Sequence, residues 1–219
     1  MYQSFVGHEL LNELVAAQGL ARLLGEIANE LTEEHRSLLT RLADRLQAVD
    51  HQARQVAEVG RLLREAAYGP SWSVEPMLQE TQTQLSALSA TNGMKYNVAI
   101  TAIKVSVCNR WLRRVLQELL DNARQAVGSS RDGCIAVELS MQQERCLLSV
   151  RDNGIGFAEK DRMSILTPFQ PGRRFHSRGI GLGFFLIRQI LPRWRGCLRI
   201  DSIPGDTCVS VEFAPTEET

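Results

Sequence analysis

The sequence has no long apolar run, no excess of charge of either sign and no proline between residues 5 and 66. The 25 basic and 25 acidic residues balance, so the charge favours neither nucleic acid nor an anionic membrane surface as a partner. No apolar run approaches the roughly 18 residues that cross a bilayer. Residues 1–10 also lack the basic and apolar regions of a signal peptide. We therefore expect a cytoplasmic chain; only a segment that could precede it in a longer parent protein would attach it to a membrane.

Closely spaced cysteine pairs are also missing. The five cysteines stand far apart without a CxxC pair, which argues against a disulfide framework and gives little support to a metal site. A hydrophobic content of 44% is that of an ordinary soluble globular protein. We expect buried, reduced thiols at all five positions: Cys108, Cys134, Cys146, Cys197 and Cys208.

The proline-free stretch predicts two long amphipathic helices. Apolar or small residues recur there at alternating spacings of three and four, first over residues 7–28 and again over 38–63. Thr32, followed by two glutamates, is a typical start for the second helix. Two antiparallel helices alone bury too little apolar surface, so we expect two such hairpins to form a homodimeric four-helix bundle. The alternative is a hairpin packed on its own downstream domain.

The sequence changes character at residues 68–71, which suggest a turn-like linker. Beyond it, short apolar or alternating runs predict strands, and helical patterns lie between them. We therefore expect an α+β protein, with a helical-hairpin domain over residues 1–68 and an α/β sandwich over residues 69–219. The predicted strands cover residues 98–107, 134–139, 146–150, 198–203 and 208–213, and the predicted helices cover 111–127 and 182–191.

Two segments of the second half carry polar residues suited to a nucleotide. Glu118 and Asn122 are four residues apart and share one face of a helix. Asp152 follows a strand-like run, where its carboxylate can accept a hydrogen bond from an adenine amino group. Gly154 and Gly156 come next and let the backbone approach a ligand closely. Taken singly, the first segment is a polar helix face and the second a good β-turn.

Two further segments complete an ordered set of four. Residues 157–178 have no regular pattern, and a loop of that length is often a lid; it contains Phe169 and ends on Arg178. Glycines then open an apolar helix, where free N–H groups and the helix dipole suit a phosphate. A lone GxGxG is weak evidence, but all four segments in this order rarely arise by chance. The helix opening comprises Gly179, Gly181, Leu182 and Gly183.

This set resembles the N, G1, F and G2 boxes of the GHKL (Bergerat) ATPase superfamily, which includes histidine kinases, gyrase and MutL. The resemblance implies ATP and Mg²⁺ as cofactors. Asn122 resembles the residue that holds Mg²⁺, and Asp152 resembles the aspartate that recognises adenine. The glycines at 179, 181 and 183 resemble the triphosphate-binding turn. Two positions depart from the kinase pattern: Glu118 replaces the usual asparagine, and Gln125 replaces a common lysine or arginine.

The first predicted helix contains His8-Glu9-Leu10-Leu11-Asn12, which resembles the H box of the dimerising phosphoacceptor module. His8 falls beside the apolar seam, where the bundle would hold it open to an incoming nucleotide. Glu9 could accept the imidazole N–H and make the other nitrogen more nucleophilic. Asn12 lies one turn on, near enough to orient a water attacking an aspartyl phosphate. Glu13 stands where a proline is usual in this box.

The combined resemblance implies the core of a sensor histidine kinase. ATP would phosphorylate His8, with Glu118 polarising the nucleophile, and the phosphoryl group would pass to an aspartate of a response-regulator receiver domain. Glu9 and Asn12 match an ExxN pattern that the family links to the reverse phosphatase activity.

Three alternatives stay open at this point. The chain could be a non-enzymatic histidine phosphotransfer protein with a decayed ATP site. It could be a GHKL ATPase or serine kinase in which His8 is incidental. It could also be a module that inhibits another kinase by forming heterodimers. Nucleotide binding and the acid stability of any phosphate bond separate these possibilities.

Overall fold

The computed structural model describes residues 32–62, 64–128, 132–157 and 183–217, together with six helical positions nearer the N-terminus: 15, 17, 19, 20, 22 and 23. The chain divides into two compact units, Met1–Arg64 and Glu65–Thr219. Within the described ranges, no helix combines the length and the apolarity that a membrane span requires.

Helix α2, Glu33–Leu62, is the main described element of the first unit. It begins directly after Thr32, as the sequence predicted, and the Thr32 hydroxyl accepts a weak hydrogen bond from the backbone N–H of His35 at 3.4 Å. Part of its apolar stripe is open to solvent, since Leu38, Leu42 and Val49 are 53%, 47% and 44% exposed. Apolar residues repeated along one helix face are typical of a surface that packs against another helix.

The predicted linker at residues 68–71 is wrong. Strand β1, Tyr68–Ser73, pairs antiparallel with β3, Lys104–Val107, in a two-stranded sheet. The indole N–H of Trp72 donates to the carbonyl of Val107 at 2.8 Å and reinforces this pairing. The Gly-Pro pair suggested a turn, but a proline is tolerated in an edge strand because its missing N–H is not needed there. Strand β1 lies within the second compact unit, Glu65–Thr219.

The main sheet of the second unit has five strands in the order β2-β4-β5-β7-β6. Strand β2 runs parallel to β4, and the other neighbours are antiparallel. The predicted strands after residue 130 are confirmed. The bounds are β2 Lys95–Ala99, β4 Cys134–Gln142, β5 Arg145–Asp152, β6 Cys197–Ile203 and β7 Asp206–Phe213.

The single strand predicted over residues 98–107 is wrong, because the chain changes sheets there. Strand β2 ends at Ala99, and β3 begins at Lys104 in the two-stranded sheet. Between them, the carbonyl of Ile103 accepts a hydrogen bond from the N–H of Val74 at 2.9 Å. The continuous apolar character of this stretch concealed the break, since apolar runs do not reveal which sheet a residue joins.

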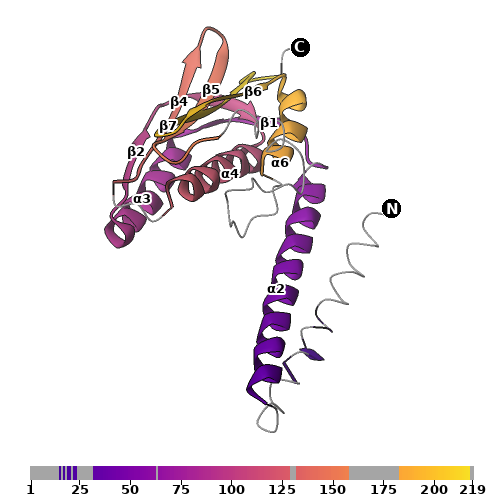
Figure 1. Ribbon diagram of the computed structural model, residues 1–219. Helices are drawn as coiled ribbons and strands as arrows, with labels where there is room; N and C mark the ends of the chain where they lie inside the picture. Colours follow the sequence, from indigo (N-terminus) through magenta and orange to yellow (C-terminus); the bar gives the residue numbers. More distant parts are fainter. Residues whose placement is uncertain are drawn as a thin grey trace. The chain divides into compact units, whose positions relative to one another are not determined.

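Helices cover one face of the main sheet, as Figure 1 shows for α3 and α4. Their bounds are α3 Glu75–Asn92, α4 Asn109–Val127 and α6 Gly183–Ile190, followed by the 3₁₀ turn η3, Leu191–Trp194. The sequence predicted α4 and α6 but gave no sign of α3, which is rich in Gln, Thr and Ser and has only a weak apolar face. The α+β arrangement of this unit is confirmed.

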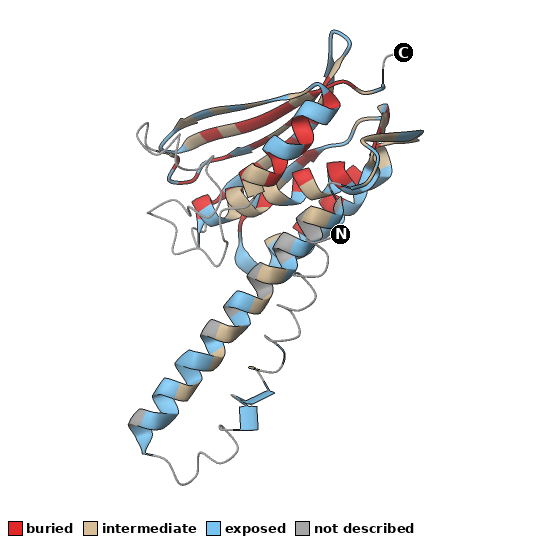
Figure 2. Cartoon of the chain, turned by 90° about the vertical axis from the view of Figure 1, so that its right-hand side faces the viewer, coloured by how far each residue is buried: buried red, intermediate tan, exposed pale blue. Residues whose placement is uncertain are grey.

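The core lies between these helices and the sheet, where the buried residues gather in Figure 2. Alternate residues of β4, β5 and β7 face the helices, among them Val137, Val150 and Val209. Trp194 joins the layers, with its ring centroid 5.9 Å from Trp111 and 5.2 Å from Phe213. Each fully buried aliphatic or aromatic side chain contributes about 1.5–3 kcal/mol. This packing fixes the orientation of α4, and with it the polar side chains along its edge.

The cysteines are all free, but the prediction that all five are buried is wrong. Only Cys146 is fully buried, while Cys108 and Cys208 are half-buried and Cys134 and Cys197 are exposed. Cys197 and Cys208 point to the face of the sheet that carries no helix, because they alternate with the core-facing residues of β6 and β7.

Candidate functional site

Asp152, the last residue of β5, is a carboxylic acid in the core face of the sheet. Its side chain is 5% exposed, and its cross-strand neighbours are Ile135 on β4 and Thr207 on β7. Burial raises the pKa of this carboxyl from 3.8 to about 6; a 2.9 Å hydrogen bond from the Gly154 N–H opposes the increase, and the charge of Asp206 adds to it. A buried carboxyl with a perturbed pKa is a good candidate for a ligand contact.

The turn after Asp152 is tied to the start of β4 by Asn153. The Asn153 amide oxygen accepts a hydrogen bond from the backbone N–H of Cys134 at 2.7 Å. Its amide nitrogen donates a hydrogen bond to the carbonyl of Asp132 at 2.8 Å. The sequence assigned Asn153 only a turn preference. Its structural role is to hold the turn, and therefore Asp152, in one position.

Gly154 and Gly156 stand where no side chain fits. A Cβ at Gly154 would lie 2.4 Å from the carbonyl carbon of Ala126, and the next N–H, from Ile155, donates to the Ala126 carbonyl at 3.1 Å. Gly156 has φ +66°, and a Cβ there would lie 2.8 Å from the carbonyl oxygen of Ile203. The close approach that these glycines permit in the structure is therefore to α4 and β6.

Polar side chains form a row across the core face beside Asp152. The Ser202 hydroxyl accepts a hydrogen bond from the N–H of Phe157 at 2.8 Å. It shares a second hydrogen bond of 2.8 Å with the hydroxyl of Thr207. Thr207 is 1% exposed. The sequence did not predict this pair. The available signal was a threonine at a position where β7 otherwise alternates apolar residues toward the core.

Glu118 and Asn122 lie one turn apart on α4, both half-buried. The amide nitrogen of Asn122 is buried and has no hydrogen-bond partner among the described residues. A buried donor without a partner costs about 1–3 kcal/mol, so this position suits a ligand that supplies an acceptor. Glu118 is paired with Arg114, with 2.6 Å between the guanidinium nitrogen and Oε1. Arg114 was not among the sequence candidates, although its spacing of four from Glu118 could have indicated the pair.

Gly183 brings the start of α6 to Glu118. A Cβ at Gly183 would lie only 2.5 Å from Oε2 of Glu118. The predicted apolar helix is confirmed, since α6 buries Phe184, Leu186, Ile187 and Ile190. The structure thus places five predicted site residues along or beside α4, while Gly156 packs against β6. The five are Glu118, Asn122, Asp152, Gly154 and Gly183.

Eight predicted site residues lie outside the described residues. They are His8, Glu9, Asn12, Phe169, Arg178, Gly179, Gly181 and Leu182.

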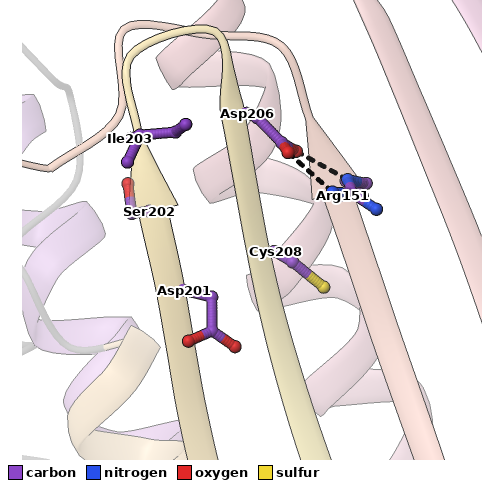
Figure 3. Close-up of a pocket in the computed structure, with 6 residues that line it drawn as sticks. All are labelled: Arg151, Asp201, Ser202, Ile203, Asp206 and Cys208. Carbon is purple, nitrogen blue, oxygen red and sulfur yellow. Dashed lines mark hydrogen bonds and ion pairs between the residues drawn. The ribbon is translucent and has the colours of Figure 1, made fainter.

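A separate hollow of about 210 Å³ lies on the face of the sheet away from the helices (Figure 3). Arg151 and Asp206 line it and form a bidentate ion pair, in which both nitrogen–oxygen distances are 2.6 Å. Because Arg151 and Asp206 each precede a core-facing residue, Asp152 and Thr207, their side chains point to the opposite face. The ion pair therefore lies on the face opposite Asp152, although Ser202, which pairs with Thr207 beside Asp152, also lines the hollow.

Known proteins resemble the chain in both sequence and fold. The sensor protein DctB of Rhizobium meliloti, named for C4-dicarboxylate transport, is 34% identical over 102 residues, 47% of this chain and 16% of that protein. The sensor histidine kinase ZraS of Salmonella typhi is 26% identical over 215 residues, 96% of this chain and 44% of that protein. The chain spans less than half the length of these curated relatives.

Solved structures of histidine kinases share the fold. Full-length ShkA in complex with AMPPNP has a TM-score of 0.70 and 23% identity, covering 98% of this chain and 46% of that one. Acinetobacter baumannii histidine kinase AdeS has a TM-score of 0.62 and 18% identity, covering 95% and 98%. One family matches residues 108–217, the stretch that runs from α4 through the Asp152 turn to β7. The chain belongs to this family, the histidine kinase-, DNA gyrase B- and HSP90-like ATPases.

Proposed function

We propose that the chain is the kinase core of a two-component sensor histidine kinase. It uses ATP to phosphorylate His8 and passes the phosphoryl group to an aspartate of a response-regulator receiver domain. The observation that carries the proposal is the buried Asp152, held against α4 by Gly154 within the stretch that matches the ATPase family. The similarity to ZraS over 96% of the chain supports the kinase assignment in particular.

In this proposal the adenine lies at Asp152 and the phosphates lie near Asn122 and Gly183. The Asp152 carboxylate accepts a hydrogen bond from the adenine amino group, a charge-assisted bond of about 1.5–3 kcal/mol. The start of α6 supplies backbone N–H groups and a positive dipole end for phosphate. We also assign nucleotide contacts to the remaining candidates of the lid and the turn: Phe169, Arg178, Gly179, Gly181 and Leu182.

Mg²⁺ fits the donor set at Asn122. Magnesium takes oxygen ligands and is usually held by one or two protein groups plus substrate phosphates. The amide oxygen of Asn122 would hold the ion, and the buried amide nitrogen, which has no partner among the described residues, could donate to a phosphate oxygen. When bound, the ion would neutralise charge on the phosphates.

Phosphoryl transfer needs positioning more than covalent chemistry from the protein. A His8 ring nitrogen forms the bond to the γ-phosphorus while the bond to the β–γ bridging oxygen breaks and ADP leaves. The Glu9 carboxylate accepts a hydrogen bond from the N–H of the other ring nitrogen. Glu118 polarises the nucleophile. In the reverse activity, Asn12 with Glu9 orients a water toward the aspartyl phosphate of the regulator.

The proposed dimer would form through the helical hairpin of residues 1–68. The exposed Leu38, Leu42 and Val49 on α2 supply an apolar face for a second copy, as in a four-helix bundle. The same bundle would present His8 to the receiver domain. A cytoplasmic location, with any membrane attachment through an upstream segment, stays a prediction.

The test is incubation of the full chain with γ-labelled ATP and Mg²⁺, comparing the native protein with His8→Gln. A matched control is His35→Gln, which changes an exposed histidine on α2. We expect a label that is labile to acid and stable to base, lost in His8→Gln and kept in His35→Gln. An acid-stable label, or hydrolysis that survives His8→Gln, would identify a serine kinase or ATPase instead. Nucleotide binding without any label would identify an inhibitory or phosphotransfer protein.

A further inference from the structure

Arg114 and Glu118 form a sheltered ion pair on α4. The guanidinium nitrogen lies 2.6 Å from Oε1 of Glu118, and the two side chains are only 21% and 18% exposed. The other carboxylate oxygen of Glu118 borders Gly183 at the start of α6. A pair with this geometry is held more firmly than the long-chain ion pairs of an open surface.

Two contacts set the direction in which a nucleotide lies along α4. The Asp152 turn meets α4 at Ala126, through Gly154, and the start of α6 meets α4 at Glu118, through Gly183. Eight residues separate Ala126 from Glu118, so the two contacts are about 12 Å apart along the helix axis. A nucleotide with its base at Asp152 therefore extends toward the N-terminal end of α4. Its terminal phosphate arrives near Glu118, one turn from Arg114.

A terminal phosphate at this place meets a carboxylate of the same charge. The repulsion between Glu118 and the phosphate favours an arrangement in which a cation lies between them. Arg114 is the cation already paired with Glu118, and its planar fork suits phosphate oxygens. Arg124, on the last turn of α4, is instead paired with Asp121 at 3.3 Å, and position 125 carries glutamine.

We propose that Arg114 binds the terminal phosphate of ATP and thereby distinguishes ATP from ADP. In the ATP complex the guanidinium shifts its hydrogen bonds from Glu118 to the γ-phosphate, and the Glu118 carboxylate then polarises the nucleophile. In the ADP complex no γ-phosphate competes, and the Arg114–Glu118 pair persists. This inference rests on the proposed function, since it assumes that the site binds ATP.

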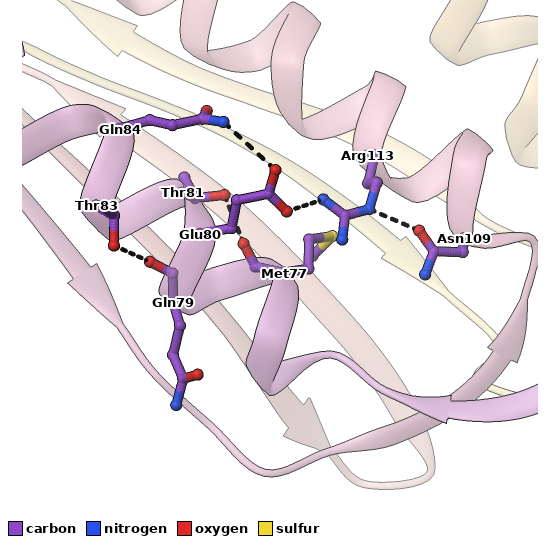
Figure 4. A network of polar contacts seen from close by, with 8 residues as sticks. All are labelled: Met77, Gln79, Glu80, Thr81, Thr83, Gln84, Asn109 and Arg113. Atoms are coloured by element: carbon purple, nitrogen blue, oxygen red, sulfur yellow. Dashed lines mark hydrogen bonds and ion pairs between the residues drawn. The ribbon is translucent and has the colours of Figure 1, made fainter.

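Arg113 provides a matched control on the same helix (Figure 4). Its guanidinium donates to Oδ1 of Asn109 at 2.7 Å and to Oε2 of Glu80 on α3 at 2.6 Å. The residue is exposed and engages α3 instead of α6. Replacing it removes one arginine from α4 without touching Glu118.

The test measures AMPPNP and ADP affinities of the full chain by calorimetry with Mg²⁺ present, AMPPNP serving as the ligand with a γ-phosphate. Arg114→Gln should weaken AMPPNP binding about tenfold or more and change ADP binding by less than about twofold. Arg114→Lys, which keeps the charge without the planar fork, should recover part of the AMPPNP affinity. Arg113→Gln should leave both affinities at the native values.

Equal weakening of both ligands by Arg114→Gln would make Arg114 a structural residue and overturn the inference. An unchanged AMPPNP affinity would also overturn it, by placing the phosphate elsewhere. If the native chain bound neither ligand, the proposed function itself would fall together with the inference. ADP binding by the Arg114→Gln variant also reports that the variant is folded.

Discussion

Gly154 packs directly on the backbone of Ala126, which joins the turn after Asp152 to the last turn of α4. A Cβ at Gly154 would lie 2.5 Å from the Ala126 carbonyl oxygen. That oxygen accepts a hydrogen bond from the N–H of Ile155 at 3.1 Å. The position of Asp152 relative to the polar edge of α4 therefore depends on the absence of one side chain.

Gly154→Ala should disrupt this junction. Because the methyl group would meet backbone atoms of Ala126, it forces the turn away from α4, and we expect a loss of about 1–3 kcal/mol in the free energy of unfolding. Nucleotide affinity should fall as Asp152 moves. Urea denaturation and calorimetry measure the two effects. Gly69→Ala is the control, since a Cβ at Gly69 meets nothing within 4 Å; a Gly154→Ala variant as stable as Gly69→Ala would contradict this description of the junction.

Asn122→Ala should separate stability from metal-dependent activity. The buried amide nitrogen has no hydrogen-bond partner among the described residues. Removing it therefore removes the free-energy cost of an unpaired buried donor and breaks no hydrogen bond. The free energy of unfolding without nucleotide should be unchanged or higher, while Mg²⁺-dependent labelling should be lost. Denaturation and γ-labelled ATP provide the two measurements. A destabilised variant that retains labelling would remove Asn122 from the metal site.

The sequence predicted the elements that alternate cleanly but not those whose composition is ambiguous. Strands β4, β5, β6 and β7 were recognised because one face is apolar and the other polar. Helix α3 was missed because a polar helix with a weak apolar face shows little period. Strand β1 was missed because Gly69 and Pro70 indicate a turn more often than an edge strand.

The same distinction applies to the candidate site. Asp152 and its glycines were recognisable because they follow one another along the chain. The hydrogen bond between Ser202 and Thr207 depends on the register of β6 and β7, where these residues are cross-strand partners. Local spacing does not give that register, which tertiary packing sets. The contact between Glu118 and Gly183 joins residues far apart in the sequence and likewise required the fold.

Asp152→Asn should stabilise the protein at neutral pH. The pKa of the Asp152 carboxyl rises from 3.8 to about 6 in the folded chain, mainly through burial. The folded state therefore holds a proton that the unfolded state has lost, and native stability falls as the pH rises from about 4 to about 6. Above pH 6 the ionised Asp152 carboxylate lowers the free energy of unfolding by its full amount, of the order of 3 kcal/mol. Asp152→Asn removes this charge, so its stability should not show that decline.

Denaturant titrations of the native chain and Asp152→Asn between pH 4 and pH 8 measure this effect. The native protein should be the less stable of the two above pH 6, and the difference should shrink toward pH 4. Parallel pH profiles for the two proteins would mean that the folded-state pKa of Asp152 is not raised.

The affinity of the full chain for ATP, measured by calorimetry at pH 7.5 for the native protein and Asp152→Asn, tests the nucleotide site most directly. We predict that the native chain binds ATP and that Asp152→Asn binds it weaker by about 1.5–3 kcal/mol, the worth of a hydrogen bond to a charged acceptor. Since the variant should be more stable than the native chain, unfolding cannot account for that loss. An unchanged affinity in Asp152→Asn, or no ATP binding by the native chain, would contradict the assignment.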